Sequence, residues 1–158
     1  MLFRSVIVGS DDHDYADRLK RLAHELKIAD RVHIVGFQDP VQPFLAALDL
    51  YVHPALMEGF GIAVVEAMAM AMGKAVVATT TGGLPEVVAQ GETGLLVPPG
   101  DIGSLAATVV SLLEDRALRE QMGRNGKARA QERFSLDASV RQMEQLYGEV
   151  LGAQKGKG

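Results

Sequence analysis

From residue 5 to about residue 97, short apolar runs alternate with segments whose apolar residues recur at helical spacing. The runs are only a few residues long and rich in β-branched side chains, which is typical of buried strands. We expect strands at 5–9, 32–35, 50–53, 75–79 and 95–97. Between them the spacing predicts helices at 14–27, 40–48 and 61–72. Apolar strands that alternate with helices indicate a parallel sheet covered on both faces.

The pattern changes at Asp101, after which the chain is predicted to be helical. Helices are expected at about 101–114, 115–131 and 135–150, and Asp101 and Ser135 suit their N-cap positions. Residues 152–158, rich in glycine and lysine, are predicted to form a disordered tail. The predicted fold class is therefore α/β, a Rossmann-like parallel sheet with helices on both faces and a helical carboxyl-terminal extension, in one domain over residues 1–151.

Composition narrows the classes of partner. The 158 residues are 47% hydrophobic and 23% charged, which is typical of a globular protein with a real core. A net charge of −4 gives no general attraction to nucleic acid or to anionic membranes. There is no cysteine and the histidines show no ligand spacing, so no metal is assigned. No apolar run reaches the ~18 residues that span a bilayer, so we expect no integral membrane segment and a cytoplasmic location.

The most informative chemistry lies where the strand 50–53 gives way to the helix 61–72. Gly59 and Gly61 stand at this junction, where glycine lets the backbone approach a ligand and a helix start offers N–H groups and partial positive charge. Glu58 precedes the glycines, and Glu66 lies about 7 Å further along the helix axis. Two acceptors on either side of an anion cradle suit a ligand with hydroxyls at both ends and phosphate between them, such as a nucleotide-sugar.

This segment resembles the retaining glycosyltransferases of the large group 1 class (family 4), which have the GT-B architecture. The resemblance continues downstream at matching spacings and covers about residues 5–147. The motifs that carry it are Glu58–Glu66, Glu66–Ala69, Gly73, Val76–Ala78, Gly82–Val88, Gly91, Gly94–Pro98 and Phe134–Ser135. It implies transfer of a sugar from a nucleotide-diphosphate sugar to a hydroxyl acceptor, with retention of configuration and without a cofactor.

The resemblance also implies roles for single residues. Glu58 would lie beside the transferred sugar and is the candidate catalytic residue, while Glu66 would accept hydrogen bonds from the ribose hydroxyls. The backbone N–H groups that would meet sugar and phosphate belong to Gly59, Phe60, Gly61 and Ile62. The residues that would hold the nucleotide base are Gly36, Phe37 and Gln38, at the carboxyl end of a strand. The loop expected to line the same cleft contains Thr81, Gly82 and Gly83.

Each of these interpretations has a structural alternative. Glu58 could be a solvated loop carboxylate or a helix cap, and Glu66 an acid favoured by the helix dipole, although a charge in an apolar helix is costly without a partner. The glycines could simply make tight turns, and the segments 36–38 and 81–83 could be plain connections. His53, at the end of a strand beside Pro54, is more often structural than catalytic in such a position.

At its amino-terminal end the chain departs from the family pattern. A donor-binding half normally opens with one more strand–helix unit, which carries an Arg and a Lys for the diphosphate, and an acceptor-binding half precedes it. Between Arg31 and Arg116 the only Lys or Arg is Lys74, although a diphosphate needs cations or many backbone donors. In a doubly wound sheet the absent strand would be central, so we expect its neighbours to expose unpaired edges that favour self-association.

We therefore expect the donor-binding half of a retaining hexosyltransferase that is inactive, or nearly so, by itself. The full-length enzyme would be cytoplasmic or at the inner face of the membrane. The alternative is a non-catalytic nucleotide-sugar binding fragment, or a partner module whose cleft is completed by a separate chain. A sugar-nucleotide epimerase of the same architecture ranks lower, because such enzymes lack the Glu58-to-Glu66 pattern.

Overall fold

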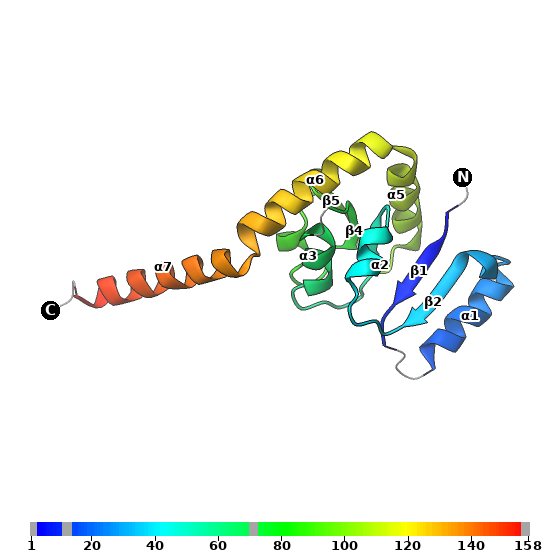
Figure 1. The fold of residues 1–158 in the computed structure, drawn as a ribbon, viewed down its shortest axis with the longest axis horizontal. Coiled ribbons are helices and arrows are strands. Elements are labelled where there is room, and N and C mark those ends of the chain that lie inside the picture. Colours follow the sequence, from blue (N-terminus) through cyan, green and yellow to red (C-terminus); the bar gives the residue numbers. More distant parts are fainter. Residues whose placement is uncertain (1–2, 11–13, 70–72, 156–158) are drawn as a thin grey trace. The chain divides into compact units, whose positions relative to one another are not determined.

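The computed structural model describes residues 3–10, 14–69 and 73–155. The chain divides into two compact units, Met1–Val41 and Gln42–Gly158 (Figure 1). Both units are built from parallel strands and helices, so the predicted α/β class is confirmed. The strands belong to two sheets, one in each unit, where a single sheet was expected.

The first unit is a strand–helix–strand arrangement. Its elements are β1 (Ser5–Val8), α1 (Tyr15–Glu25), the 3-10 helix η1 (Ala29–Arg31) and β2 (Val32–Gly36). β1 and β2 pair in parallel, with Ser5 opposite Val32 and a register shift before Val8. α1 packs on β2 and buries Ala23. Its predicted strands and helix are thus confirmed, whereas η1 was not predicted.

The second unit holds a three-stranded parallel sheet followed by helices. Its strands are β3 (Tyr51–His53), β4 (Val76–Thr79) and β5 (Gly94–Val97), in the order β3-β4-β5. Its first helices are α2 (Gln42–Ala47), α3 (Ile62–Ala69) and α4 (Leu84–Val87). The last three are α5 (Ile102–Glu114), α6 (Arg116–Arg133) and α7 (Leu136–Lys155).

The buried strand β4 explains why helices cover both faces of this sheet. All four of its residues are buried, and successive strand side chains point to opposite faces. Val76 and Ala78 belong to a core with Val64, Met68, Leu84, Val87, Val88 and Ala130, from α3, α4 with the residue after it, and α6. Val77 belongs, with Ala75, to a second core that includes Leu112 of α5 and Met122 of α6. An uninterrupted apolar strand therefore requires a helical layer on each side.

The first strand of each sheet, β1 or β3, is an edge strand. Within the described ranges β1 pairs with β2 alone, and β3 pairs with β4 alone. Each of these two strands therefore has backbone N–H and C=O groups along one side that no described strand pairs with.

The carboxyl-terminal helices begin as expected, and one ends later. The Asp101 carboxylate accepts the Ser104 N–H at 2.9 Å, and the Ser135 hydroxyl accepts the Ala138 N–H at 3.2 Å, so both predicted N-caps are confirmed. α7 continues past residue 150 to Lys155, into the segment 152–158 that was expected to be disordered, because alanine, glutamine and lysine favour helix. Residues 156–158 and 70–72, the latter expected to be helical, lie outside the described residues.

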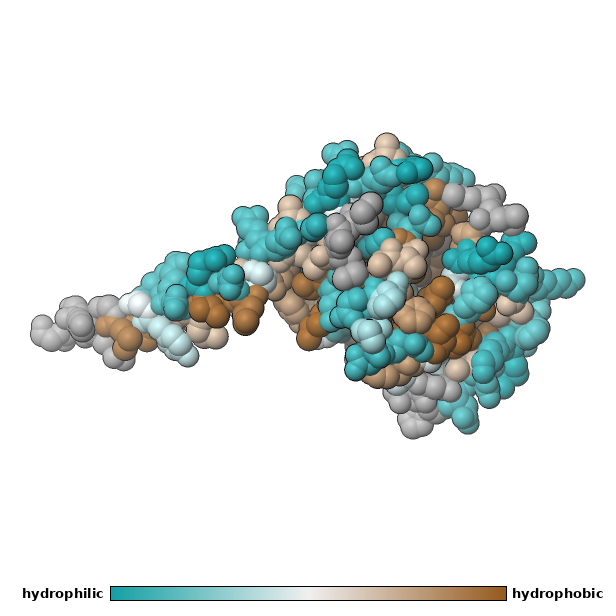
Figure 2. Space-filling model, viewed as in Figure 1, coloured by the Kyte–Doolittle hydropathy of each residue, from teal (hydrophilic) through white to brown (hydrophobic). Residues whose placement is uncertain are grey.

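α7 extends from the rest of the second unit (Figure 1) and carries an exposed apolar stripe (Figure 2). The large apolar side chains exposed along it are Leu136, Val140, Met143, Leu146, Tyr147, Val150 and Leu151. Among the described residues, no helix combines the length and the apolar content that crossing a membrane requires.

α6 approaches the chain before β4 so closely that only glycine fits at position 123, whereas a Cβ at Gly126 would make an ordinary van der Waals contact. A Cβ at Gly123 would lie 2.9 Å from the carbonyl oxygen of Gly73, and a Cβ at Gly126 would lie 3.4 Å from Cγ of Met68. Because the first of these neighbours is backbone, it cannot move aside cheaply. α6 is thereby held against α3 and the entrance to β4.

We predict that Gly123→Ala lowers the free energy of unfolding by about 1–2 kcal/mol, because overpacking outweighs the gain in helix propensity. Gly148→Ala is the matched control, since a Cβ there meets nothing within 4 Å. That control should leave stability unchanged or raise it slightly. Urea unfolding of the two variants measures the difference, and equal stabilities would contradict the packing described here.

Candidate functional site

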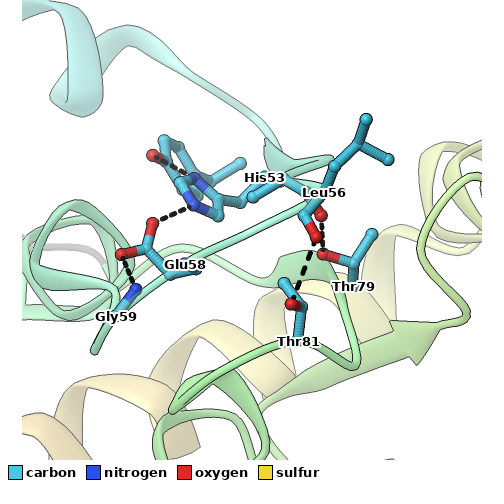
Figure 3. Close-up of polar contacts among 8 residues, drawn as sticks. His53, Leu56, Glu58, Gly59, Thr79 and Thr81 are labelled. Carbon is cyan, nitrogen blue, oxygen red and sulfur yellow. Dashed lines mark hydrogen bonds and ion pairs between the residues drawn. The ribbon is translucent and has the colours of Figure 1, made fainter.

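Two loops meet at the carboxyl ends of β3 and β4. The Gly83 N–H donates to the Gly59 carbonyl oxygen at 2.7 Å. Two threonine hydroxyls donate to other carbonyl oxygens of the loop that follows β3 (Figure 3): Thr79 to Ala55 at 2.6 Å, and Thr81 to Leu56 at 3.3 Å. The loop after β3 is thus held by β4 and the loop after β4. Carboxyl ends of parallel strands are where open α/β sheets bind ligands.

Glycine is required at three positions of this loop pair. Gly82 has φ +52°, and a Cβ there would collide with the carbonyl oxygen of Glu58. Gly61 has φ +93°, and a Cβ there would lie 2.6 Å from Cδ2 of Leu84. Gly59 differs, because it has no left-handed backbone and a Cβ there would meet no atom within 4 Å. A Cβ at Gly83 would lie 2.9 Å from the carbonyl oxygen of Gly59, so the fold accounts for Gly61, Gly82 and Gly83 but not for Gly59.

The Glu58 carboxylate is held by hydrogen bonds to both oxygens. His53 Nε2 lies 2.8 Å from one oxygen, and the Gly59 N–H donates to the other at 2.9 Å (Figure 3). The side chain is half-buried. The His53 hydrogen bond first, with smaller contributions from the Gly59 and Gly61 N–H groups, holds the pKa of Glu58 below its usual range. Glu58 is therefore an oriented carboxylate that is ionised at neutral pH.

The charges of Glu58 and Glu66 both affect the phenol of Tyr51. Burial above all, and then the charges of Glu66 and Glu58, raise the pKa of Tyr51 to about 12. Its hydroxyl oxygen is 3.4 Å from His53 Nδ1. Both carboxylates thus act on the phenol of Tyr51, the first residue of β3.

Glu66 is half-buried in α3. In the part of the chain that the structure describes, its carboxylate accepts no hydrogen bond and forms no ion pair. α3 begins at Ile62, as predicted, so the loop that carries Glu58 runs directly into the helix that carries Glu66. The Glu66 carboxylate is therefore open to an external donor.

Phe60 leaves the loop on the side of α6. Its ring packs edge-on against Phe134 at 5.7 Å between centroids, and the Arg129 guanidinium lies over Phe134 at 5.9 Å. Arg129 also donates to the carbonyl oxygens of Glu86 and Val87 at the end of α4. A groove of about 590 Å³ lies here, and it is lined by Phe60, Pro85, Glu86, Arg129, Arg133, Phe134, Ser139 and Gln142. The sequence gave no sign of this contact, because Phe60 lies far from Arg129 and Phe134 along the chain.

Lys74 has a structural role. It is buried, and its Nζ donates to the carbonyl oxygens of Ala46 at 2.8 Å and Leu48 at 2.7 Å, at the end of α2. This is the only Lys or Arg between Arg31 and Arg116. The stretch that forms the loop pair thus brings no lysine of its own to a phosphate.

The remaining predicted residues, Gly36, Phe37 and Gln38, lie in the first unit. Gly36 ends β2 with φ +71°, where glycine is favoured. The Gln38 side chain donates to the Val35 carbonyl oxygen at 2.7 Å, and Phe37 is 73% exposed. Among the described residues no three His, Asp or Glu side chains gather in a way that could hold a metal ion.

A parallel α/β fold with polar loops at the carboxyl ends of adjacent strands is typical of nucleotide-binding domains. The chain belongs to the family of group 1 glycosyl transferases, whose model matches residues 3–129. The family that the sequence resembles is thereby confirmed.

Curated relatives and solved structures agree with this assignment. The chain is 37% identical to N-acetyl-alpha-D-glucosaminyl L-malate synthase of Bacillus anthracis, over 85% of this chain and 35% of that protein. It is 38% identical to D-inositol 3-phosphate glycosyltransferase of Corynebacterium efficiens, over 85% and 32%. The structure of HepE from Anabaena with UDP matches with a TM-score of 0.82 and 32% identity, over 96% of this chain and 41% of that one. The chain spans about a third of the length of these curated relatives.

We predict that Gly82→Ala is among the most destabilising single changes in the second unit. The new Cβ would collide with the Glu58 carbonyl oxygen, and alanine would also be strained by the left-handed backbone conformation at this position. Gly91→Ala is the control for the backbone term, since Gly91 has φ +78° and a Cβ there meets nothing within 4 Å. Left-handed strain alone costs about 1–2 kcal/mol. Thermal or urea unfolding should show Gly82→Ala at least about 2 kcal/mol less stable than Gly91→Ala. Equal losses would mean that the two loops can separate freely.

Proposed function

We propose that this chain is the donor-binding half of a retaining glycosyltransferase, which moves a sugar from a nucleotide-diphosphate sugar to a hydroxyl acceptor. The observation that carries the proposal is the loop pair, where an oriented carboxylate, an exposed glycine and a helix start lie together. This combination offers acceptors for hydroxyls and donors for an anion within one short segment.

Glu58 is the proposed catalytic residue and contacts the hydroxyls of the transferred sugar. Its pKa is lowered, so at neutral pH it is an acceptor and a negative charge. Glycosyl transfer develops positive charge on the sugar, which a fixed carboxylate stabilises better than a mobile one. The two hydrogen bonds from His53 and Gly59 fix this charge before the donor arrives.

Glu66 is the proposed partner of the ribose hydroxyls. Its carboxylate accepts no hydrogen bond within the described residues. A partly buried carboxylate has lost part of its hydration, so a hydrogen bond from a ligand hydroxyl offsets that cost. The N–H groups of Phe60, Gly61 and Ile62 are proposed to meet sugar and phosphate, and the loop of Thr81, Gly82 and Gly83 to line the cleft. Gly59 donates its own N–H to Glu58, so its proposed role is to let the ligand approach the backbone closely. Gly59 fits this role because nothing in the fold explains why it is glycine.

The nucleotide base is proposed to lie at Gly36, Phe37 and Gln38, where the exposed Phe37 ring offers a stacking surface. Structures similar to this chain contain UDP, or UDP and glucose, or UDP-glucose. UDP and UDP-glucose are therefore the first ligands to test. No cofactor is proposed besides the donor substrate, and a cytoplasmic location stays a prediction.

We predict that the two acids bind different parts of the donor, Glu66 the nucleotide and Glu58 the sugar. Glu66→Ala should weaken UDP and UDP-glucose alike, by about tenfold, because it removes an acceptor of charge-assisted hydrogen bonds to the ribose. Glu58→Ala should weaken UDP-glucose by about tenfold and leave UDP nearly unchanged. Titration calorimetry measures both constants.

Glu114→Ala is the matched control for these variants, because Glu114 is exposed at the end of α5. It should bind both ligands as the unmodified chain does. No saturable binding of any nucleotide or nucleotide-sugar by the unmodified chain would sink the donor-site proposal. If Glu58→Ala weakened UDP and UDP-glucose equally, the proposal that Glu58 contacts the sugar would be wrong.

A second candidate is a non-catalytic nucleotide-sugar module, or a partner completed by a separate chain. It is favoured by the structural use of Lys74, which holds the end of α2 instead of reaching the loop pair. On either proposal the chain alone turns over slowly or not at all, because acceptor and diphosphate contacts are incomplete. Release of UDP from UDP-glucose with a panel of simple acceptors tests this. Turnover at rates typical of enzymes, about 1–1000 per second, would contradict it.

We also propose that the free edges of β1 and β3 promote self-association, because an unpaired strand edge is a template for another strand. Sedimentation velocity over a range of concentrations should then show species larger than the monomer. A monomer at every concentration, together with ordinary stability, would count against this.

A further inference from the structure

His53 lies in a chain of hydrogen-bonding groups that extends from the half-buried phenol of Tyr51 to Glu58, the acid proposed to contact the sugar. Its Nδ1 is 3.4 Å from the Tyr51 hydroxyl, and its Nε2 is 2.8 Å from the Glu58 carboxylate. The rings of Tyr51 and His53 are also stacked, with centroids 6.1 Å apart and planes 19° apart. Figure 3 shows His53 directed at Glu58, with the Gly59 N–H on the other carboxylate oxygen.

The proton positions in this chain follow from the chemistry of its ends. An ionised carboxylate can only accept, so Nε2 of His53 must carry the proton in that hydrogen bond. In a neutral ring Nδ1 is then an acceptor. The Tyr51 hydroxyl stays protonated, since burial and the nearby acids raise the pKa of Tyr51 to about 12. It can therefore donate to Nδ1. The hydrogen bonds then run in one direction: the phenol donates to the imidazole, and the imidazole donates to the carboxylate.

We propose that His53 is a positioning residue, which Tyr51 holds in one tautomer and orientation so that its Nε2–H fixes the Glu58 carboxylate at the sugar subsite. The proposal rests on the role of Glu58 proposed above and adds the device that orients it. All three residues lie on β3 or in the loop that follows it. The side chains of Tyr51 and His53 point to the same face, because residues two apart on a strand share a face.

A positioning role for His53 has a different consequence from a role in packing alone. His53 and Glu58 side chains are 19% and 26% exposed, so the hydrogen bond is partly shielded from water while Glu58 remains open to a ligand. Without it, the carboxylate would keep only backbone donors and could rotate. The loss should therefore fall on the sugar and spare the nucleotide.

Proton NMR of the chain with ¹⁵N-labelled histidine tests the arrangement directly, at pH ~8, where histidine is ordinarily neutral. The His53→Gln variant identifies the His53 signals among the four histidines. We expect a proton on Nε2 that exchanges slowly enough to be observed, that disappears in Glu58→Ala and that persists in Glu114→Ala. Tyr51→Phe should speed its exchange. A proton on Nδ1, or no protected Nε2 proton, would overturn the proposal.

A second measurement tests the consequence. His53→Ala should weaken UDP-glucose by about tenfold and change UDP by less than about twofold, whereas His53→Gln, whose amide can reach the same carboxylate, should recover part of the loss. Equal losses for both ligands would make His53 merely structural and overturn the positioning role. If the unmodified chain binds neither ligand, the donor-site proposal fails, and the NMR result still decides whether His53 holds Glu58.

Discussion

The close approach of two backbone loops is the constraint on which the site depends. The Gly83 N–H reaches the Gly59 carbonyl oxygen, and Gly82 passes the Glu58 carbonyl where no side chain could fit. The loop that carries Glu58 is therefore positioned by the neighbouring strand, which is buried on both faces. A rigid core thus determines where a polar loop lies, which is how a fold can place a charge that must act on a ligand.

The same constraint gives the two acids different surroundings. Glu58 is held by donors from the protein, and its pKa is lowered as a result. Glu66, a few residues into the following helix, accepts no hydrogen bond among the described residues. An acid that is already oriented suits a reacting centre, where reorganisation costs rate. An acid that is open suits a substrate group that brings its own donors. The geometry therefore favours different roles for two residues of one type.

The family of the chain and the use of its nearest lysine both bear on the candidate site. It belongs to the group 1 glycosyl transferases, yet it spans about a third of the length of the curated relatives it matches. Lys74, the cation nearest in sequence to the loop pair, holds the end of α2 instead, and β1 and β3 keep one unpaired edge each within the described residues.

The sequence alone determined most of the elements and the strand–helix junction that carries the candidate site. Apolar runs and helical spacing predicted the strands and most helices, and two acids beside glycines located the strand–helix junction, because these signals lie within a few neighbouring residues. Only the tertiary structure showed that His53 holds Glu58, that Lys74 is buried and that Arg129 lies over Phe134 beside Phe60. The last two join segments far apart in the chain, and the first depends on how a loop folds back on its own strand. The division of the strands into two sheets was also decided there, since pairing joins strands that the sequence separates.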